Sequence, residues 1–310
     1  MTRTVSMLPA ATEMVAALGL LDQLVGVSHE CDFPEPVNAR PRVTRCEVHG
    51  AGLPSAEIDR WVADRLRAGD PLYTIDEGLL RDLAPDLILT QRLCDVCAPA
   101  YGSVAALAGT LPSRPRALNL EPASLGDIFG NVRQVAAAMG HSDRAGDVVR
   151  GLEDRVAAVR DRAAGLDRPT VFVMEWADPI YNAGHWTPEL VDLAGGVPVL
   201  AAAGRDSVRV AWADLRAADP EVLIVACCGH GVGRTFRDLT TLEALPGWRR
   251  LRAVRSSRVY VADGSAYFSR PGPRVVDTLE LIASALHPGA FRGLYPDRGL
   301  VRVGGAAPAP

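Results

Sequence analysis

The segment DRAGDVVRGLEDRVAAVRDRAA, residues 143–164, decides how the rest of this 310-residue chain is organised. Its apolar side chains recur at intervals of three and four residues, which places them on one face of an α-helix. A helix of this length spans roughly 33 Å at 1.5 Å per residue. Few Gly or Pro residues interrupt it. We therefore predict a stiff helical strut between two halves of the chain.

Short apolar runs on both sides of this segment alternate with helical segments. Such runs are typical of strands that are buried on both faces of a parallel sheet. We predict strands at 4–8, 24–27, 87–90 and 116–120, and again at 170–174, 222–226 and 259–262. We predict helices at 13–18, 55–67, 76–83, 125–139, 187–194, 212–218 and 274–286, and a loop at 34–52.

This pattern predicts an α/β protein of two Rossmann-like lobes joined by one long helix. We expect an N-terminal lobe at 1–142, the connecting helix at 143–164 and a C-terminal lobe at 165–288. The tail at 289–310 is rich in Gly, Ala and Pro, and we expect it to be disordered.

The composition excludes several classes of protein. The chain is 48% hydrophobic and 23% charged, with a formal net charge of -4, so we expect neither nucleic-acid binding nor a basic phosphate-tracking patch. All 33 basic residues are arginine, which excludes a Schiff-base lysine and a P-loop lysine. We find no nucleophile elbow, GxGxxG or paired-carboxylate signature, and we expect a protein without catalytic residues.

The N-terminus and the six cysteines bear on location. The first residues lack the charged region, long apolar region and cleavage site of a signal peptide, and no apolar run is long enough to span a membrane. We therefore expect a cytoplasmic monomer with reduced thiols and no membrane insertion. A true start upstream of Met1 would instead make the protein extracytoplasmic.

Two strand ends carry metal-capable side chains. The strand at 24–27 runs into Ser-His-Glu-Cys-Asp, residues 28–32, and the strand at 87–90 leads to Cys94 and Cys97. If these ends lie side by side, His29 and Cys31 complete a four-ligand set with the two later cysteines. Zinc or iron binding, a redox dithiol and buried inert thiols all remain open.

A second cysteine loop, Cys227-Cys228-Gly229-His230, follows the strand at 222–226. Vicinal cysteines do not easily chelate one ion together, and Gly-rich loops are common after strands. The loop could offer metal ligands from the C-terminal lobe, but we favour a structural role for it.

Aromatic and polar side chains also gather at predicted strand ends. Trp176, Trp186, Tyr267 and Phe268 offer flat rings that could stack on a planar ligand such as a corrin or porphyrin, or pack in the core. His185 could bind the metal of such a ligand as an axial imidazole, or lie exposed on a loop.

Several motifs resemble those of the helical-backbone (class III) substrate-binding proteins, in the cobalamin and iron-siderophore branch. They are Leu8-Pro-Ala-Ala-Thr-Glu13, Val25-Gly-Val-Ser28 with Asp32-Phe-Pro34, Leu83-Ala-Pro-Asp-Leu-Ile88 with its echo at 218–224, Tyr181-Asn-Ala-Gly184 and Ser269-Arg-Pro-Gly-Pro-Arg274. The resemblance covers roughly residues 3–287. The His29-Glu30-Cys31 and Cys94-x-x-Cys97 elements are typical only of a subset without a signal peptide.

The resemblance implies a substrate-binding protein of an ABC transporter. Its ligand would be cobalamin, another corrinoid or an iron chelate, held between the lobes, and its partner would be a membrane permease. The alternative is a cytoplasmic metalloprotein or cofactor-handling enzyme whose His29, Cys31, Cys94 and Cys97 hold zinc or iron. We expect the ligand to contact Pro9, Ala10, Ala11, Ser28, Glu30, Asp32, Gln91, Glu175, Trp176, His185, Trp186, Tyr267, Phe268 and Arg270.

Overall fold

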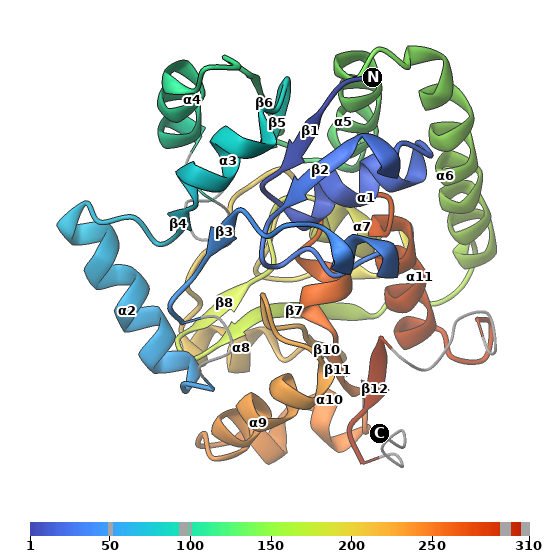
Figure 1. Cartoon of the computed structure of the whole chain (residues 1–310). Helices are drawn as coiled ribbons and strands as arrows, with labels where there is room; N and C mark the ends of the chain where they lie inside the picture. The colour runs from blue at the N-terminus through green and yellow to red at the C-terminus, as the bar shows by residue number, and fades with distance from the viewer. Residues whose placement is uncertain (49–51, 93–98, 100, 292–298, 305–310) are drawn as a thin grey trace. The chain divides into compact units, whose positions relative to one another are not determined.

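A computed structural model of the chain describes residues 1–48, 52–92, 99, 101–291 and 299–304 (Figure 1). The chain divides into two compact units. The N-terminal unit comprises residues 1–53, 57–122 and 126–151, and the C-terminal unit comprises 54–56, 123–125 and 152–310. Among the described residues, no helix combines the length and the apolar character needed to cross a bilayer.

The predicted long helix is present as one continuous element, α6 (Ser142–Ala163), drawn in green in Figure 1. Its first half belongs to the N-terminal unit, where Arg144 donates to the carbonyl oxygens of Leu18 and Gly19, both at 3.1 Å. Its second half belongs to the C-terminal unit. The boundary between the compact units therefore falls inside this helix, which we predicted as a separate connecting segment at 143–164.

The N-terminal unit is built on a four-stranded parallel sheet. Its order is β2 (Leu24–Val27), β1 (Thr4–Ser6), β5 (Leu87–Thr90) and β6 (Arg116–Asn119). The strands are short and mostly buried, as expected for a sheet with covered faces. Its helices are α1 (Pro9–Ala17), α2 (Ser55–Ala68), α3 (Glu77–Leu83), α4 (Tyr101–Thr110) and α5 (Leu125–Ala138), although the first residues of α2 (Ser55 and Ala56) and of α5 (Leu125) belong to the C-terminal unit. Strand β3 (Thr44–Arg45) pairs separately with β4 (Thr74–Ile75).

The C-terminal unit contains a six-stranded mixed sheet. Its order is β12 (Leu300–Arg302), β11 (Val259–Ala262), β10 (Val222–Val225), β7 (Thr170–Ala177) and β8 (Ile180–Asn182), and β9 (Val197–Pro198) also pairs with β7. The central strands β7, β10 and β11 are parallel, whereas β8 and β12 are antiparallel to their neighbours. The helices are α7 (Thr187–Leu193), α8 (Trp212–Ala218), α9 (Val232–Glu243), α10 (Arg252–Arg255) and α11 (Val275–Leu286).

The structure corrects four predictions. Helix α1 begins at Pro9 and not at Glu13, because proline suits the first turn of a helix, where its missing N–H costs nothing. Part of the tail is ordered, since β12 pairs with β11. The predicted loop at 34–52 includes a 3-10 helix at Glu35–Ala39 and strand β3. Helices α4 and α9 were not predicted.

Both sheets have a point where successive connections run in opposite directions. In the N-terminal sheet it lies between β1 and β5, and in the C-terminal sheet between β7 and β10. In open α/β sheets, ligands bind beyond the carboxyl ends of the strands at such a switch point. Each unit therefore has one sheet edge where a site is expected.

Arg155 of α6 forms a charge cluster with α11. It donates to Asp277 at 2.5 Å and makes a two-point contact with Glu280, whose side chain is only 6% exposed. Replacing Arg155 with alanine is expected to destabilise the protein by about 1–3 kcal/mol, because buried Glu280 loses a charged donor. Urea unfolding followed by circular dichroism would show the midpoint move to lower urea.

Arg160 supplies the matched control on the same helix. It pairs with Asp161, and both side chains are well exposed. Arg160→Ala should change the stability by less than about 0.5 kcal/mol, as is usual for exposed ion pairs. Equal midpoints for the two variants would contradict a structural role for the Arg155 cluster.

Candidate functional site

At the carboxyl edge of the N-terminal sheet, the loop after the edge strand β2 is organised around the Thr44 hydroxyl. This hydroxyl donates to Ser28 Oγ at 3.1 Å and accepts from the His29 backbone N–H at 3.1 Å. His29 Nδ1 lies 2.8 Å from the same oxygen. The imidazole also packs against the Tyr73 ring, with 5.7 Å between the two ring centroids. The His29 side chain is therefore fixed by its own unit.

The predicted ligand Cys31 points into the core of the N-terminal unit. It is 1% exposed, and its Sγ lies 3.1 Å from the Thr12 hydroxyl of α1. Arg42 fixes the loop backbone by donating to the carbonyl oxygens of Ser28, at 3.0 Å, and Cys31. Cys94 and Cys97 lie outside the described residues, so the four-ligand metal site remains a prediction.

The other predicted contact residues of this unit differ in accessibility. Ala10, Ala11 and Ser28 are buried in α1 and the β2 loop, and Gln91, directly after β5, is also buried. Pro9 and Glu30 are half-buried, and Asp32 is exposed. Of these predicted contact residues, only Pro9, Glu30 and Asp32 therefore have side chains that reach the surface.

At the switch point of the C-terminal sheet, the β10–α9 loop continues the pairing with β7. The Cys228 backbone N–H donates to the carbonyl oxygen of Glu175 at 2.8 Å, one step past the last paired strand residues. Gly229 has φ of +71°, and the His230 N–H donates back to the Cys227 carbonyl at 3.0 Å. This tight turn brings Cys227 and His230 to the same side of the loop.

The same turn places three metal-capable groups together. One ligand atom each from Cys227, His230 and Asp238 of α9 lie within 4.8 Å of one another, and this is the only such group of three among the residues that the structure describes. His230 Nδ1 is 2.8 Å from Asp238 Oδ2, and Ser55 donates to Asp238 Oδ1 at 2.6 Å.

The electrostatics of this cluster follow from burial and hydrogen bonding. Burial, with the nearby Asp238 carboxylate, raises the pKa of the Cys227 thiol well above its ordinary value. Burial also acts to raise the pKa of Asp238, but hydrogen bonds from His230 and Ser55 and the charge of Arg234 outweigh it and lower that pKa. Without a metal ion, the cluster therefore consists of a protonated thiol and an ionised carboxylate.

The aromatic residues of this edge lie in different environments. Trp176 is half-buried at the end of β7, its ring centroid is 5.1 Å from that of His230, and its Nε1 donates to the Asp178 carbonyl at 3.0 Å. Trp186 is buried, and its Nε1 has no hydrogen-bond partner within the described part of the chain. Glu175, beside Trp176, is half-buried.

His185 lies on a loop that the segment at 205–208 covers. Its backbone has φ of +51°, and its Nε2 is 3.4 Å from the exposed carboxylate of Asp206. Gly184 cannot be replaced without displacing this loop, because a Cβ there would collide with the backbone at 205–207. Burial lowers the pKa of His185, and Asp206 opposes the shift.

The predicted residues after β11 form a short π-helical turn, Gly264–Phe268, capped by Asp263, which accepts from the Ala266 N–H at 2.7 Å. Phe268 and Arg270 are buried, whereas Tyr267 is half-buried with the Arg274 guanidinium 5.4 Å from its ring centroid. Tyr267 is therefore the more accessible of the two predicted aromatic rings.

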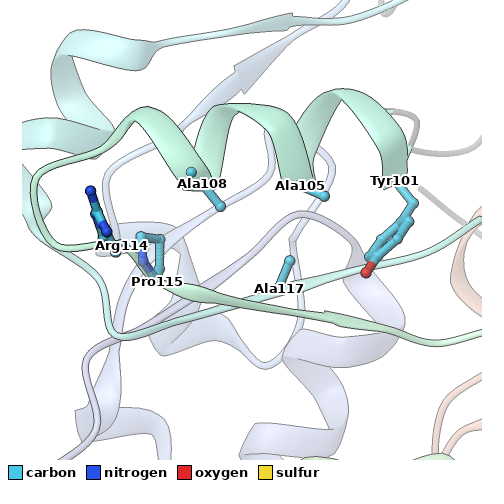
Figure 2. Close-up of a pocket in the computed structure, with 7 residues that line it drawn as sticks. Tyr101, Ala105, Ala108, Arg114, Pro115 and Ala117 are labelled. Atoms are coloured by element: carbon cyan, nitrogen blue, oxygen red, sulfur yellow. The ribbon is translucent and has the colours of Figure 1, made fainter.

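A cavity of about 460 Å³ lies in the N-terminal unit between α4 and β6 (Figure 2). Figure 2 shows Tyr101 at one end of the cavity lining and Arg114 at the other, with Ala105, Ala108 and Ala117 between them. Most lining residues carry small apolar side chains, and the cavity lies along the flank of the sheet. It therefore offers little chemistry to a polar or metal-containing ligand.

A second cavity, of about 710 Å³, lies in the C-terminal unit beside Pro169, Glu221 and Arg258. These residues directly precede β7, β10 and β11. The cavity is therefore at the amino ends of the strands, the edge opposite to the one where ligands of α/β sheets bind. Its Arg258 guanidinium already donates to the Leu286 carbonyl at 2.7 Å.

The sequence interpretation of the Cys227 loop missed the cluster. The Cys-x-x-His spacing supplied two ligands, but the third, Asp238, lies on a helix that was not predicted. A signal was available in the sequence, since a short ligand pair followed at a distance by another ligand is typical of metal sites.

A model of the periplasmic binding protein family matches residues 5–266. A vitamin B12-binding protein of Vibrio cholerae is 23% identical over 92% of this chain and 88% of its own length. An uncharacterised ABC transporter substrate-binding lipoprotein of Bacillus subtilis, YvrC, is 21% identical over 94% and 81%. The crystal structure of a periplasmic heme-binding protein from Pseudomonas aeruginosa superimposes with a TM-score of 0.71 at 20% identity, covering 93% of each chain.

His185 gives a testable pH dependence. The pKa of His185 in the folded protein is expected to lie below 6.5, its ordinary value. At pH values below 6.5 the unfolded chain therefore binds more protons than the folded chain does at this residue, and the contribution of His185 to stability falls as the pH falls. NMR titration of the His185 ring resonances would measure the midpoint. Asp206→Asn should lower the midpoint further, and a midpoint above 6.5 in the wild type would contradict the burial of this ring.

Proposed function

The chain belongs to the periplasmic binding protein family, and we propose that it is the substrate-binding component of an ABC transporter for a corrinoid, heme or another iron chelate. The family match over residues 5–266 is the observation that carries this proposal. Relatives whose names state vitamin B12 or heme binding support the ligand class. All of these ligands contain a chelated metal, and corrinoids and hemes hold it at the centre of a large flat ring.

The residues at the strand ends suit such a ligand. Trp176 and Tyr267 are half-buried rings in the C-terminal unit, and stacking on a flat macrocycle uses aromatic faces of this kind. Trp186 adds a buried indole N–H that has no partner among the described residues. A ligand with carboxylate or amide substituents, as hemes and corrinoids have, offers acceptors for such a donor.

A permease is the partner that this function implies. The resemblance to class III substrate-binding proteins implies one acidic docking residue on each lobe, and we propose Glu77 and Glu221 for this role. Glu77 is exposed in the first turn of α3. Glu221 accepts from the Thr170 backbone N–H at 2.9 Å, and this bond lowers its pKa, so that its carboxylate stays ionised at neutral pH.

A metal-dependent, cofactor-handling protein is the second candidate function. The observation in its favour is the group formed by Cys227, His230 and Asp238. The two functions differ in what the purified protein carries. Stoichiometric metal that is lost in Cys227→Ser would favour the metalloprotein, whereas a chromophore bound without dependence on Cys94, Cys97 or Cys227 would favour the binding protein.

Absorption titration of the full chain with cyanocobalamin and, separately, with hemin tests the transport proposal. We expect one of them to bind with a spectral shift. Trp176→Ala should weaken that binding at least tenfold, about 1.4 kcal/mol, because a stacking ring is lost. Failure of both compounds to bind would overturn the assignment of a macrocyclic ligand and leave only a non-macrocyclic iron chelate.

Trp212→Ala is the matched control. Trp212 stacks against Trp248 at a centroid distance of 6.3 Å, and its Nε1 donates to the Pro246 carbonyl at 3.0 Å, so its ring is engaged in packing within its own unit. This variant should bind the ligand within about twofold of the wild type. Equal weakening in both tryptophan variants would show a general loss of folding and would argue against stacking by Trp176.

A further inference from the structure

The Cys227 cluster has the donors and the geometry of a transition-metal site. It offers one thiol, one imidazole and one carboxylate, all within 4.8 Å. Cys227 and Asp238 are buried, and the His230 side chain is 11% exposed. Exposed acidic groups often approach one another by chance, but a buried group of three different metal-binding side chains is uncommon.

In the absence of a metal ion, protons occupy the centre of this cluster. The Cys227 thiol is hydrogen-bonded to Asp238, and His230 Nδ1 is 2.8 Å from the same carboxylate. In the metal-free protein, the thiol of Cys227 and the ring N–H of His230 both donate to Asp238. A divalent cation would replace these two protons and bind all three side chains. The Ala177 backbone also hydrogen-bonds to Cys227 and favours the thiolate.

The surrounding structure holds the ligands in place. The Cys228 N–H donates to Glu175 at 2.8 Å, and the Ser265 N–H donates to the His230 carbonyl at 3.2 Å. A Cβ at Gly264 would collide with the Cys227 carbonyl oxygen, so the π-helical turn packs directly against the loop. The Ser55 hydroxyl donates to Asp238 at 2.6 Å and orients the carboxylate from outside the cluster, and hydrogen bonds of this kind position the ligands of metal sites.

The donor set selects the class of metal. A mixed sulfur, nitrogen and oxygen set suits Zn²⁺ and its analogue Co²⁺, whereas Ca²⁺ and Mg²⁺ require oxygen ligands. Three protein ligands leave the fourth tetrahedral position for water. A corrin or heme metal has four ring nitrogens and two axial positions, so it cannot accept three convergent side chains. The cluster therefore fits a bare ion.

We propose that Cys227, His230 and Asp238 bind a single Zn²⁺-like transition-metal ion within the C-terminal unit, with water as the fourth ligand. Binding releases the thiol proton of Cys227 to solvent. His230 binds in its neutral form through Nδ1, and its ring proton moves to Nε2. Two negative ligands then neutralise the ion, and Arg234, 3.8 Å from Asp238, remains outside the cluster. This inference does not rest on the transport function, and neither test decides the other.

Cobalt titration tests the site, because Co²⁺ bound to a thiolate gives a charge-transfer band and tetrahedral d–d bands. The full chain is used with Cys31, Cys94 and Cys97 all changed to serine, which removes the predicted N-terminal site. We expect this protein to bind one Co²⁺ with a thiolate band and to release about one proton, and Zn²⁺ should displace the cobalt. Absence of the band would overturn the proposal.

Cys227→Ser in this background should abolish the thiolate band and weaken Co²⁺ binding at least about a hundredfold. Loss of a group that only hydrogen-bonds to a metal ligand already lowers metal affinity about 10–100-fold, and Cys227 is itself a ligand. The matched control is Cys228→Ser, whose half-buried thiol is adjacent but outside the cluster. It should keep the band and bind within about threefold. Equal losses in the two variants would contradict the assignment.

His230→Gln guards against misfolding of the Cys227 variant, because it leaves the buried thiol in place. We expect near-UV circular dichroism like that of the parent protein and Co²⁺ binding at least tenfold weaker. Unchanged binding in a folded His230→Gln protein would exclude His230 as a ligand and overturn the three-residue site.

Discussion

The parallel pairing of β7 with β10 is the constraint on which the C-terminal site depends. Val225 lies opposite Met174, and both strands are buried at this point, so a shifted register would disturb the core. The register in turn fixes where the pairing ends, at the bond from Cys228 to Glu175. The loop that follows then has one geometry, and that geometry decides which side chains meet at the switch point of the sheet.

Local sequence pattern predicted much of the fold because its central elements are short, buried and clearly bounded. The observed strands β2, β5 and β11 have the predicted bounds. Helix α9 was missed because its first turn contains Gly233 and β-branched residues are frequent in it, so that packing and not propensity stabilises it. β12 was missed because its stability comes from pairing with β11, a contact that composition does not reveal.

The candidate site was only partly predictable for a related reason. The spacing of Cys227 and His230 is visible in the sequence, but Asp238 joins them only because α9 folds back beside β7 and β11. The buried environment of Cys227, among apolar residues such as Phe172 and Met174, likewise depends on long-range packing. The predicted aromatic positions were found from strand ends alone, yet the structure separates the half-buried Trp176 and Tyr267 from the buried Phe268.

The proposed function requires that the ligand contacts the carboxyl ends of β7 and β10 and not the cavity at their amino ends. Hydrogen–deuterium exchange of the full chain, with and without saturating hemin or cyanocobalamin, measures this directly. We expect slower exchange in peptides covering 175–178 and 226–231. Protection confined to 166–169 and 286–290, which line the amino-end cavity, would contradict it, as would unchanged exchange with both compounds.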